Sequence, residues 1–333
     1  MIGLCFSVAA RFPRRGDAGV APGRNIQRVL TVIALSVCVQ MAGGAEPAPD
    51  APRASLERAR RIAVLGDSIT HDGRWVAELA AWMESRSLTA EIINVGLPSE
   101  TCSGLSEEGH AGGAFPRPDL AERLERVLRV VRPDTVLAMY GMNCGIYQPL
   151  DETRFAKFRE GMERLHSEVE KSGATIIHLT PPVFDSHPAR GGAANASDYD
   201  AVLTAYSQWL LSKRADGWLV IDVHGFMRKL LDRKRETDPG FTFQPDSVHP
   251  DDAGQWAICR AVLAGLGEAT LASEEEPASL RPLLPETTQR MQVLRDAYLA
   301  AAGHTRPGLP PGLAIDAAEE KAAELTTAIR SGR

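Results

Sequence analysis

The sequence of 333 residues predicts an α/β protein, built as a three-layer α/β/α sandwich around a five-stranded parallel sheet. Short apolar runs rich in Val and Ile recur along the chain, as expected for parallel strands that are covered on both faces. Segments with helical periodicity separate these runs, and strands that alternate with helices imply right-handed βαβ units. The composition agrees with an ordinary globular protein, since 44% of the residues are hydrophobic and 24% are charged.

The predicted strands and helices alternate from residue 61 onwards. The strands are expected at Arg61–Leu65, Glu91–Val95, Thr135–Tyr140, Thr175–Leu179 and Trp218–Val223. Helical patterns lie between them at 75–83, 120–131, 155–165 and 206–210, and a last domain helix is expected at 251–266. Five strands in this arrangement predict a flavodoxin-like sandwich. Its functional site is expected beyond the carboxyl ends of the strands, near the point where the strand order reverses.

The first 45 residues have the features of a signal peptide. Arg24 and Arg28 precede an apolar run at 29–39, and small residues follow as far as Ala45. The sequence therefore predicts export to the periplasm or the extracellular space, with removal of residues 1–45. The apolar run is short for a membrane span, so no stable membrane insertion is expected after cleavage, and an uncleaved anchor is the alternative.

The remaining chain divides into three predicted parts. Residues 46–58 are rich in Ala and Pro and are expected to form a linker. The main domain is placed at 59–270. Residues 271–333 are expected to form a helical C-terminal extension, with helices at Leu284–Ala302 and Ile315–Ile329, that packs on the main domain.

Charge and cysteine content narrow the possible partners. The formal net charge is −6, and no Lys/Arg-rich run suits a phosphate backbone, so nucleic acid is not an expected partner.

The three cysteines after residue 45 are Cys102, Cys144 and Cys259, whose spacing fits neither a disulfide framework nor a metal site. They are interpreted as small buried apolar residues, with a Cys102–Cys144 disulfide as the alternative.

Two distant segments hold the residue types of a hydrolytic triad. Ser68 follows the first predicted strand in the run Gly66-Asp67-Ser68, and Asp246 stands three residues before His249. A serine hydroxyl is a weak nucleophile that needs an adjacent base, and a histidine oriented by a carboxylate supplies one. We therefore expect Ser68, His249 and Asp246 to carry out nucleophilic ester hydrolysis.

Acyl transfer also requires hydrogen-bond donors for the developing oxyanion. Ser68 is expected to begin a helix, so its own backbone N–H has no partner within that helix. Gly96 follows the second predicted strand, where a residue without a side chain lets a substrate oxygen approach the N–H. Asn143 follows the third strand and offers a side-chain amide. These three residues form the predicted oxyanion hole.

Four short blocks together resemble the SGNH, or GDSL, hydrolase family: Gly66-Asp67-Ser68, Gly96, Gly141-x-Asn143 and Asp246-x-x-His249. Their order and their positions after strands also match, and the resemblance covers about residues 60–266. It implies an α/β/α fold, no cofactor or metal, and the catalytic and oxyanion roles given above. One departure concerns Cys144, because the family usually has Asp at this position and a thiol is a poor hydrogen-bond acceptor. This departure brings into question how rigidly Asn143 is held.

The substrate is predicted less directly. His110 and Arg117 lie on the long loop after Gly96 and are candidate substrate-binding residues, with a purely structural loop as the alternative. We expect an exported carboxylic-ester hydrolase that removes acetyl or other short acyl groups from carbohydrate. The alternatives are a lipase, lysophospholipase or thioesterase of the same family, an acyltransferase using the same serine, and a non-catalytic carbohydrate-binding protein on this fold.

Overall fold

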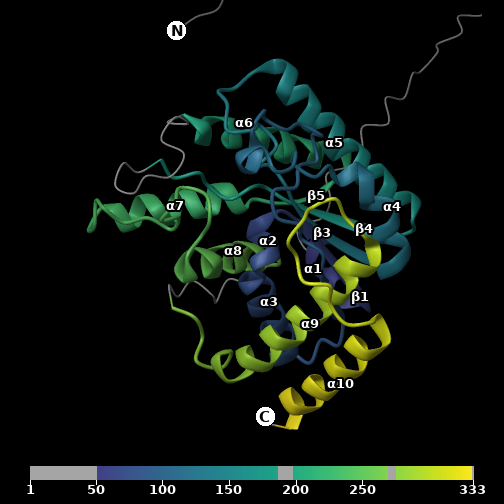
Figure 1. The fold of residues 1–333 in the computed structure, drawn as a ribbon. Helices are drawn as coiled ribbons and strands as arrows, with labels where there is room; N and C mark the ends of the chain where they lie inside the picture. The colour runs from purple at the N-terminus through teal and green to yellow at the C-terminus, as the bar shows by residue number, and fades with distance from the viewer. Residues whose placement is uncertain (1–50, 187–197, 269–274, 332–333) are drawn as a thin grey trace, which may run out of the picture. The chain divides into compact units, whose positions relative to one another are not determined.

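The computed structural model describes residues 51–186, 198–268 and 275–331 (Figure 1). The predicted signal peptide lies outside the described residues, as do residues 46–50 of the predicted linker.

A five-stranded parallel sheet forms the centre of the described chain, as predicted. Its strands are β1 (Arg61–Gly66), β2 (Glu91–Asn94), β3 (Thr135–Met139), β4 (Thr175–Leu179) and β5 (Leu219–Ile221). They pair in the order β2-β1-β3-β4-β5, and β1 places Ala63 between Ile93 of β2 and Val136 of β3. The order reverses at β1, so the carboxyl end of β1 lies at the position where such sheets bind ligands.

Helices cover both sides of this sheet (Figure 1). The main helices of the domain are α2 (Ser68–Asp72), α3 (Arg74–Ser85), α4 (Leu120–Val131), α5 (Glu152–Lys171), α6 (Tyr199–Ser212), α7 (Val223–Arg235) and α8 (Asp252–Gly265). α3 packs against α8, and α4 packs against α5. Local sequence determines where α4 starts and stops: the Asp119 side chain accepts a hydrogen bond from the N–H of Ala121 at 3.0 Å, and Pro133 follows the last turn.

Two local predictions are wrong. The fifth strand ends at Ile221 instead of Val223, because Asp222 caps α7 by accepting a hydrogen bond from the N–H of Gly225 at 2.8 Å. Residues 51–58 of the expected linker form helix α1 (Ala51–Arg58). Pro52 lies in its first turn, where the missing N–H has no intrahelical partner to lose. Leu56 of α1 is buried in the domain.

The C-terminal extension consists of α9 (Leu284–Ala302) and α10 (Ile315–Ser331), close to the predicted bounds. The two helices pack on each other, and α9 also packs against α3, α4 and β2 (Figure 1). α9 therefore covers the edge strand β2, whose unpaired backbone would otherwise invite pairing with another chain.

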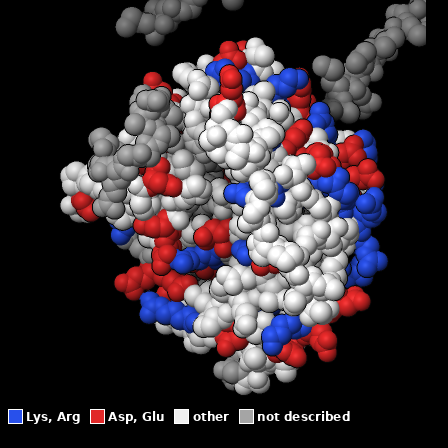
Figure 2. All heavy atoms as spheres, viewed as in Figure 1, with Lys and Arg blue, Asp and Glu red and all other residues white. Residues whose placement is uncertain are grey.

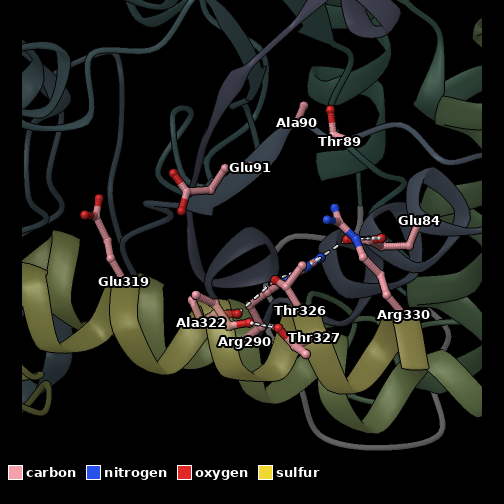
Figure 3. Close-up of a pocket in the computed structure, with 11 residues that line it drawn as sticks. Glu84, Thr89, Ala90, Glu91, Arg290, Glu319, Ala322, Thr326, Thr327 and Arg330 are labelled. Carbon is pink, nitrogen blue, oxygen red and sulfur yellow. Dashed lines mark hydrogen bonds and ion pairs between the residues drawn. The ribbon is translucent and has the colours of Figure 1, made fainter. Parts of the chain in front are cut away.

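Ion pairs connect this extension to helix α3 of the domain (Figure 3). Glu84 of α3 forms ion pairs with Arg290 of α9 at 2.8 Å and with Arg330 of α10 at 3.5 Å. Arg290 also donates a hydrogen bond to Thr326 of α10 at 2.8 Å. These contacts pair charged groups of all three helices. The pocket in Figure 3 is therefore part of the interface between α3 and the C-terminal extension.

Acidic and basic side chains lie mostly toward the margins of the face in Figure 2, and broad areas without charged side chains lie between them. Among the described residues, no helix combines the length and apolar character needed to cross a bilayer.

Candidate active site

The turn after β1 presents Ser68 at the carboxyl edge of the sheet. Gly66 ends the strand at a point where a Cβ atom would lie 2.3 Å from Thr70 Oγ1, so only glycine fits. Asp67 caps α2 by accepting a hydrogen bond from the N–H of Ile69 at 3.0 Å. Ser68 is the first residue of α2, and its backbone N–H therefore has no partner within the helix.

Ser68, His249 and Asp246 form an unbroken chain of hydrogen bonds. Ser68 Oγ lies 2.9 Å from His249 Nε2, and His249 Nδ1 lies 2.7 Å from Asp246 Oδ2. A carboxylate only accepts hydrogen bonds, so Nδ1 carries the proton and Nε2 is left to accept one from the serine. Asp246 Oδ1 also accepts hydrogen bonds from the N–H groups of Val248 and His249, at 2.9 and 2.6 Å. The Asp-x-x-His spacing thus builds a tight turn in which one side chain orients the other.

The charges of this turn favour an ionised aspartate beside the histidine. Burial alone raises the pKa of Asp246, but hydrogen bonds from His249 and from two backbone N–H groups outweigh it and bring the pKa to about 2. The hydrogen bond to Asp246 raises the pKa of His249, against the opposite effect of burial. Burial also raises the pKa of Asp67 to about 6. Asp246 therefore stays ionised and stabilises the imidazolium that forms when His249 takes a proton.

Gly96 is not a free donor, contrary to the sequence-based expectation. Its N–H donates to Asn94 Oδ1 at 2.9 Å, and its carbonyl accepts a hydrogen bond from His71 Nδ1 at 3.0 Å. A Cβ atom at this position would lie 2.7 Å from the backbone nitrogen of His71. Glycine is therefore required because β2 and α2 approach closely there.

Sequence reasoning missed Ser99, three residues further along the same loop. Ser99 has a left-handed backbone conformation, with φ of 70°, which is uncommon for a residue other than glycine. Its N–H has no acceptor among the described residues, and its carbonyl lies 3.5 Å from Arg117 Nη1. The dipeptide Pro98-Ser99 was the available signal for a turn.

The structure holds the Asn143 side chain firmly. Its Oδ1 accepts hydrogen bonds from Arg117 Nη1 at 2.9 Å and from the Tyr147 hydroxyl at 3.0 Å, and Nδ2 lies 3.3 Å from the carbonyl of Glu100. Asn143 is 4% exposed. Burial raises the pKa of Tyr147, and the carboxylates of Asp67 and Asp246 raise it further.

Cys144 does not leave this loop loose. Its N–H donates to the carbonyl of Gly141 at 2.9 Å, and its own carbonyl accepts a hydrogen bond from Ser103 Oγ at 2.9 Å. The hydroxyl of Tyr199 accepts a hydrogen bond from the N–H of Gly145 and donates one to the carbonyl of Met142. Backbone contacts thus replace the carboxylate that the family usually has at position 144.

The structure brings Cys102 and Cys144 together as free thiols. Their sulfur atoms lie 3.5 Å apart, and both side chains are buried. The third cysteine, Cys259, is free and buried in α8, as interpreted from the sequence.

His110 and Arg117 share the carboxylate of Glu107. Arg117 Nε and Nη2 each lie 2.6 Å from one Glu107 oxygen, and His110 Nδ1 donates to Glu107 at 3.2 Å. Arg117 is 9% exposed, and its guanidinium lies 5.3 Å from the centre of the Tyr147 ring. The side chain therefore points inward toward Asn143 and away from solvent. Contact of either residue with substrate remains a prediction.

Comparison with known proteins adds a family and a set of similar folds. A model of the GDSL-like lipase/acylhydrolase family matches residues 64–257, more than half of the chain. No curated protein matches the sequence significantly.

Several solved structures resemble part of the chain. A gut microbial diltiazem-metabolizing enzyme aligns with a TM-score of 0.53 and 18% identity, over 62% of this chain and 47% of its own, so this chain spans less than half of that enzyme. A catalytic mutant of an acetylxylan esterase from Geobacillus stearothermophilus aligns with a TM-score of 0.48 and 19% identity, over 62% of this chain and 94% of its own. An alpha/beta hydrolase enzyme from the metagenome of Lake Arreo, Spain, gives a TM-score of 0.46 and 23% identity, over 64% and 98%. At these identities the first likeness supports the fold alone.

Proposed function

We propose that this chain, which belongs to the GDSL-like lipase/acylhydrolase family and is an ester-bond hydrolase, acts through an acyl-enzyme on Ser68. The observation that carries this proposal is the chain of hydrogen bonds from Ser68 through His249 to Asp246, at the sheet edge where ligands bind in such folds.

In the proposed first step, Ser68 Oγ attacks the ester carbonyl carbon while His249 Nε2 takes the hydroxyl proton. Asp246 stabilises the imidazolium that forms. The backbone N–H of Ser68 and the Nδ2 of Asn143 receive the oxyanion, and Ser99 replaces Gly96 as the candidate for a third donor because its N–H has no protein acceptor within the described residues. Collapse of the tetrahedral intermediate breaks the bond to the alcohol oxygen, which takes its proton from His249.

The second step releases the acid. His249 Nε2 removes a proton from water, the resulting hydroxide attacks the acyl carbon, and Ser68 Oγ leaves with the proton returned by His249. The enzyme regains its starting state, and no cofactor enters the balance.

We propose short acyl groups on carbohydrate as the substrate class. A long acyl chain needs a continuous apolar surface, whereas the large apolar side chains that stand mostly exposed in the described part of the chain are Leu150 and Leu313. The predicted signal peptide also supports this class, because it would place the enzyme where polysaccharides are met.

Export predicts a mature protein that begins at Glu46. Mass spectrometry of the periplasmic fraction would test this, and full-length protein in the cytoplasm would contradict it.

Hydrolysis of p-nitrophenyl acetate and p-nitrophenyl octanoate, by the wild type and by Ser68→Ala, tests the reaction. We expect the wild type to prefer acetate, and Ser68→Ala to lose turnover by several orders of magnitude while keeping its fold, because triad members act as a unit. Ser212→Ala, which removes a hydroxyl from the end of α6, is the matched control and should be fully active.

Other outcomes would redirect the proposal. Equal turnover by Ser68→Ala would exclude the serine mechanism. A preference for octanoate would indicate a lipid substrate. Activity toward neither ester, nor toward acetylated oligosaccharides, would favour the non-catalytic carbohydrate-binding alternative.

A further inference from the structure

A buried arginine that faces Asn143 has a geometry suited to positioning. Arg117 is 9% exposed, and its guanidinium is divided between two partners. Nε and Nη2 form a bidentate pair with Glu107, each at 2.6 Å, whereas Nη1 donates to Asn143 Oδ1 at 2.9 Å. The bidentate pair fixes the plane of the guanidinium, so the direction of Nη1 is fixed as well.

The chemistry of these partners determines which way the Asn143 amide is turned. A guanidinium has donors and no acceptor, so the Asn143 atom that faces it must be the oxygen. Burial raises the pKa of Tyr147, whose hydroxyl therefore stays protonated and donates to the same oxygen at 3.0 Å. With the oxygen held by two donors, the NH2 group points to the opposite side. One of its hydrogens faces the carbonyl of Glu100 at 3.3 Å, and the other has no acceptor among the described residues.

The backbone near Tyr147 supports the same arrangement. Ile146 and Tyr147 both have left-handed conformations, with φ of 48° and 54°, which are uncommon for such residues. The N–H of Ile146 donates to the carbonyl of Asn143 at 3.0 Å and secures this turn. The turn therefore brings the Tyr147 hydroxyl back onto the side chain four residues earlier.

We propose that Arg117, oriented by Glu107 and assisted by Tyr147, is a positioning residue that turns the Asn143 amide toward the oxyanion. This inference rests on the proposed function in assigning Asn143 to the oxyanion hole. The guanidinium of Arg117, which donates to the amide oxygen, also polarises the amide and strengthens the remaining N–H as a donor. Arg117 thus acts through Asn143 and not by contact with the substrate.

Steady-state kinetics of a double-mutant cycle tests the proposal. With p-nitrophenyl acetate, Asn143→Ala should lower kcat by about 10²–10³-fold. Arg117→Met should lower kcat by roughly 10–100-fold with KM nearly unchanged, because it weakens the same donor. Adding Arg117→Met to Asn143→Ala should cost less than about 3-fold more, since the two side chains act as one group. Fully multiplicative losses, or a raised KM with an unchanged kcat, would overturn the proposal.

Two milder variants guard against a loss of folding. Tyr147→Phe removes one donor to Asn143 and keeps the ring against Tyr199 and Phe184. We expect a small fall in kcat. This fall should vanish when Asn143→Ala is also present. Arg117→Lys should recover part of the kcat lost in Arg117→Met, because an ammonium still donates to Asn143 but cannot pair with Glu107 in a fork. Arg86→Met breaks an ion pair with the buried Glu268, 2.7 Å away at the C-terminal end of α3, and should leave kcat unchanged.

A measurement that does not depend on turnover separates this inference from the proposed function. The side-chain amide resonances of Asn143, identified by their loss in Asn143→Ala, should shift or broaden in Arg117→Met and stay in place in Arg86→Met. Unchanged resonances in Arg117→Met would refute the positioning role even if ester hydrolysis depends on Ser68. A shift in a protein without such activity would leave the positioning intact and reject the proposed reaction.

Discussion

His249 can act as a base only when its ring is neutral, so its titration sets the acidic limit of activity. The hydrogen bond to Asp246 raises the pKa of His249, which moves this limit above the ordinary value of about 6.5. We expect kcat/KM to rise with pH through this limb, because the protonated fraction of His249 falls. Asp246→Asn should shift the limb toward lower pH and also lower kcat. The pH profile of kcat/KM with an uncharged ester gives both quantities.

The buried carboxyl of Asp67 could produce a limb in the same range, since burial raises its pKa to about 6. Asp67→Asn separates the two groups: the limb should persist in this variant if His249 is responsible. A limb that disappears in Asp67→Asn, or one that Asp246→Asn leaves in place, would contradict the assignment to His249. Asp216→Asn, in the short 3-10 turn that follows α6, serves as the charge control.

Helix α9 of the C-terminal extension packs against α2, the helix that carries Ser68. Arg295 of α9 donates to the carbonyl of His71 at 2.8 Å. Met291 of the same helix contacts Gly73, where a Cβ atom would lie 2.3 Å from the methionine Cε. Gly73 ends α2 and precedes α3 with φ of 87°. The extension is therefore part of the structure behind the nucleophile turn.

Gly73→Ala tests how closely α9 is held against this turn. Two costs are expected: about 1–2 kcal/mol for a left-handed alanine, and a further cost below about 1 kcal/mol, because the clash falls on the flexible end of the Met291 side chain. Gly217 provides the control, because it has φ of 89° and nothing within 4 Å of an added Cβ. Urea unfolding should thus show a larger loss for Gly73→Ala than for Gly217→Ala. Equal losses would mean that the Met291 side chain moves aside without measurable cost.

The fold of the whole molecule could be predicted because the same sequence pattern recurs five times along the chain. Each strand is a short apolar run between helical segments, and five such runs determine the sheet. α7 was missed because Val223 continues the apolar run of β5, and only the cap at Asp222 marks the change to helix. α1 was missed because its first residues have the composition of a linker.

The site was predictable only where local spacing encodes geometry. Asp246 and His249 stand three residues apart, so one turn joins them, and Ser68 follows a strand directly. Gly96 was misassigned because a glycine can serve close packing as well as ligand approach, and here it packs against His71. The contact from Arg117 to Asn143 links residues 26 positions apart, on two different loops. No local pattern in the sequence specifies that pairing.

The stability of the whole molecule should depend on the pH through one buried carboxyl group on α3. Glu78 of α3 is 3% exposed, and its Oε2 has no hydrogen-bond partner among the described residues. Burial raises its pKa to about 9, whereas an unfolded chain has the ordinary value of about 4.3. The unfolded state therefore releases this proton first as the pH rises. The free energy of unfolding should therefore decrease as the pH rises from about 4.3 to about 9, by at most about 1.4 kcal/mol per pH unit.

Replacing this acid by its amide should remove that dependence. Glu78→Gln should match the wild type near pH 5 and exceed it by a few kcal/mol at pH 8, because the amide has no proton to lose. Urea unfolding from pH 5 to 8 measures the difference, which also cancels the contributions of Asp67 and of other groups common to both proteins. Glu125→Gln, on the exposed face of α4, should follow the wild type throughout. A gap that stays constant with pH would show that Glu78 is ionised in the folded protein and that its buried charge is compensated.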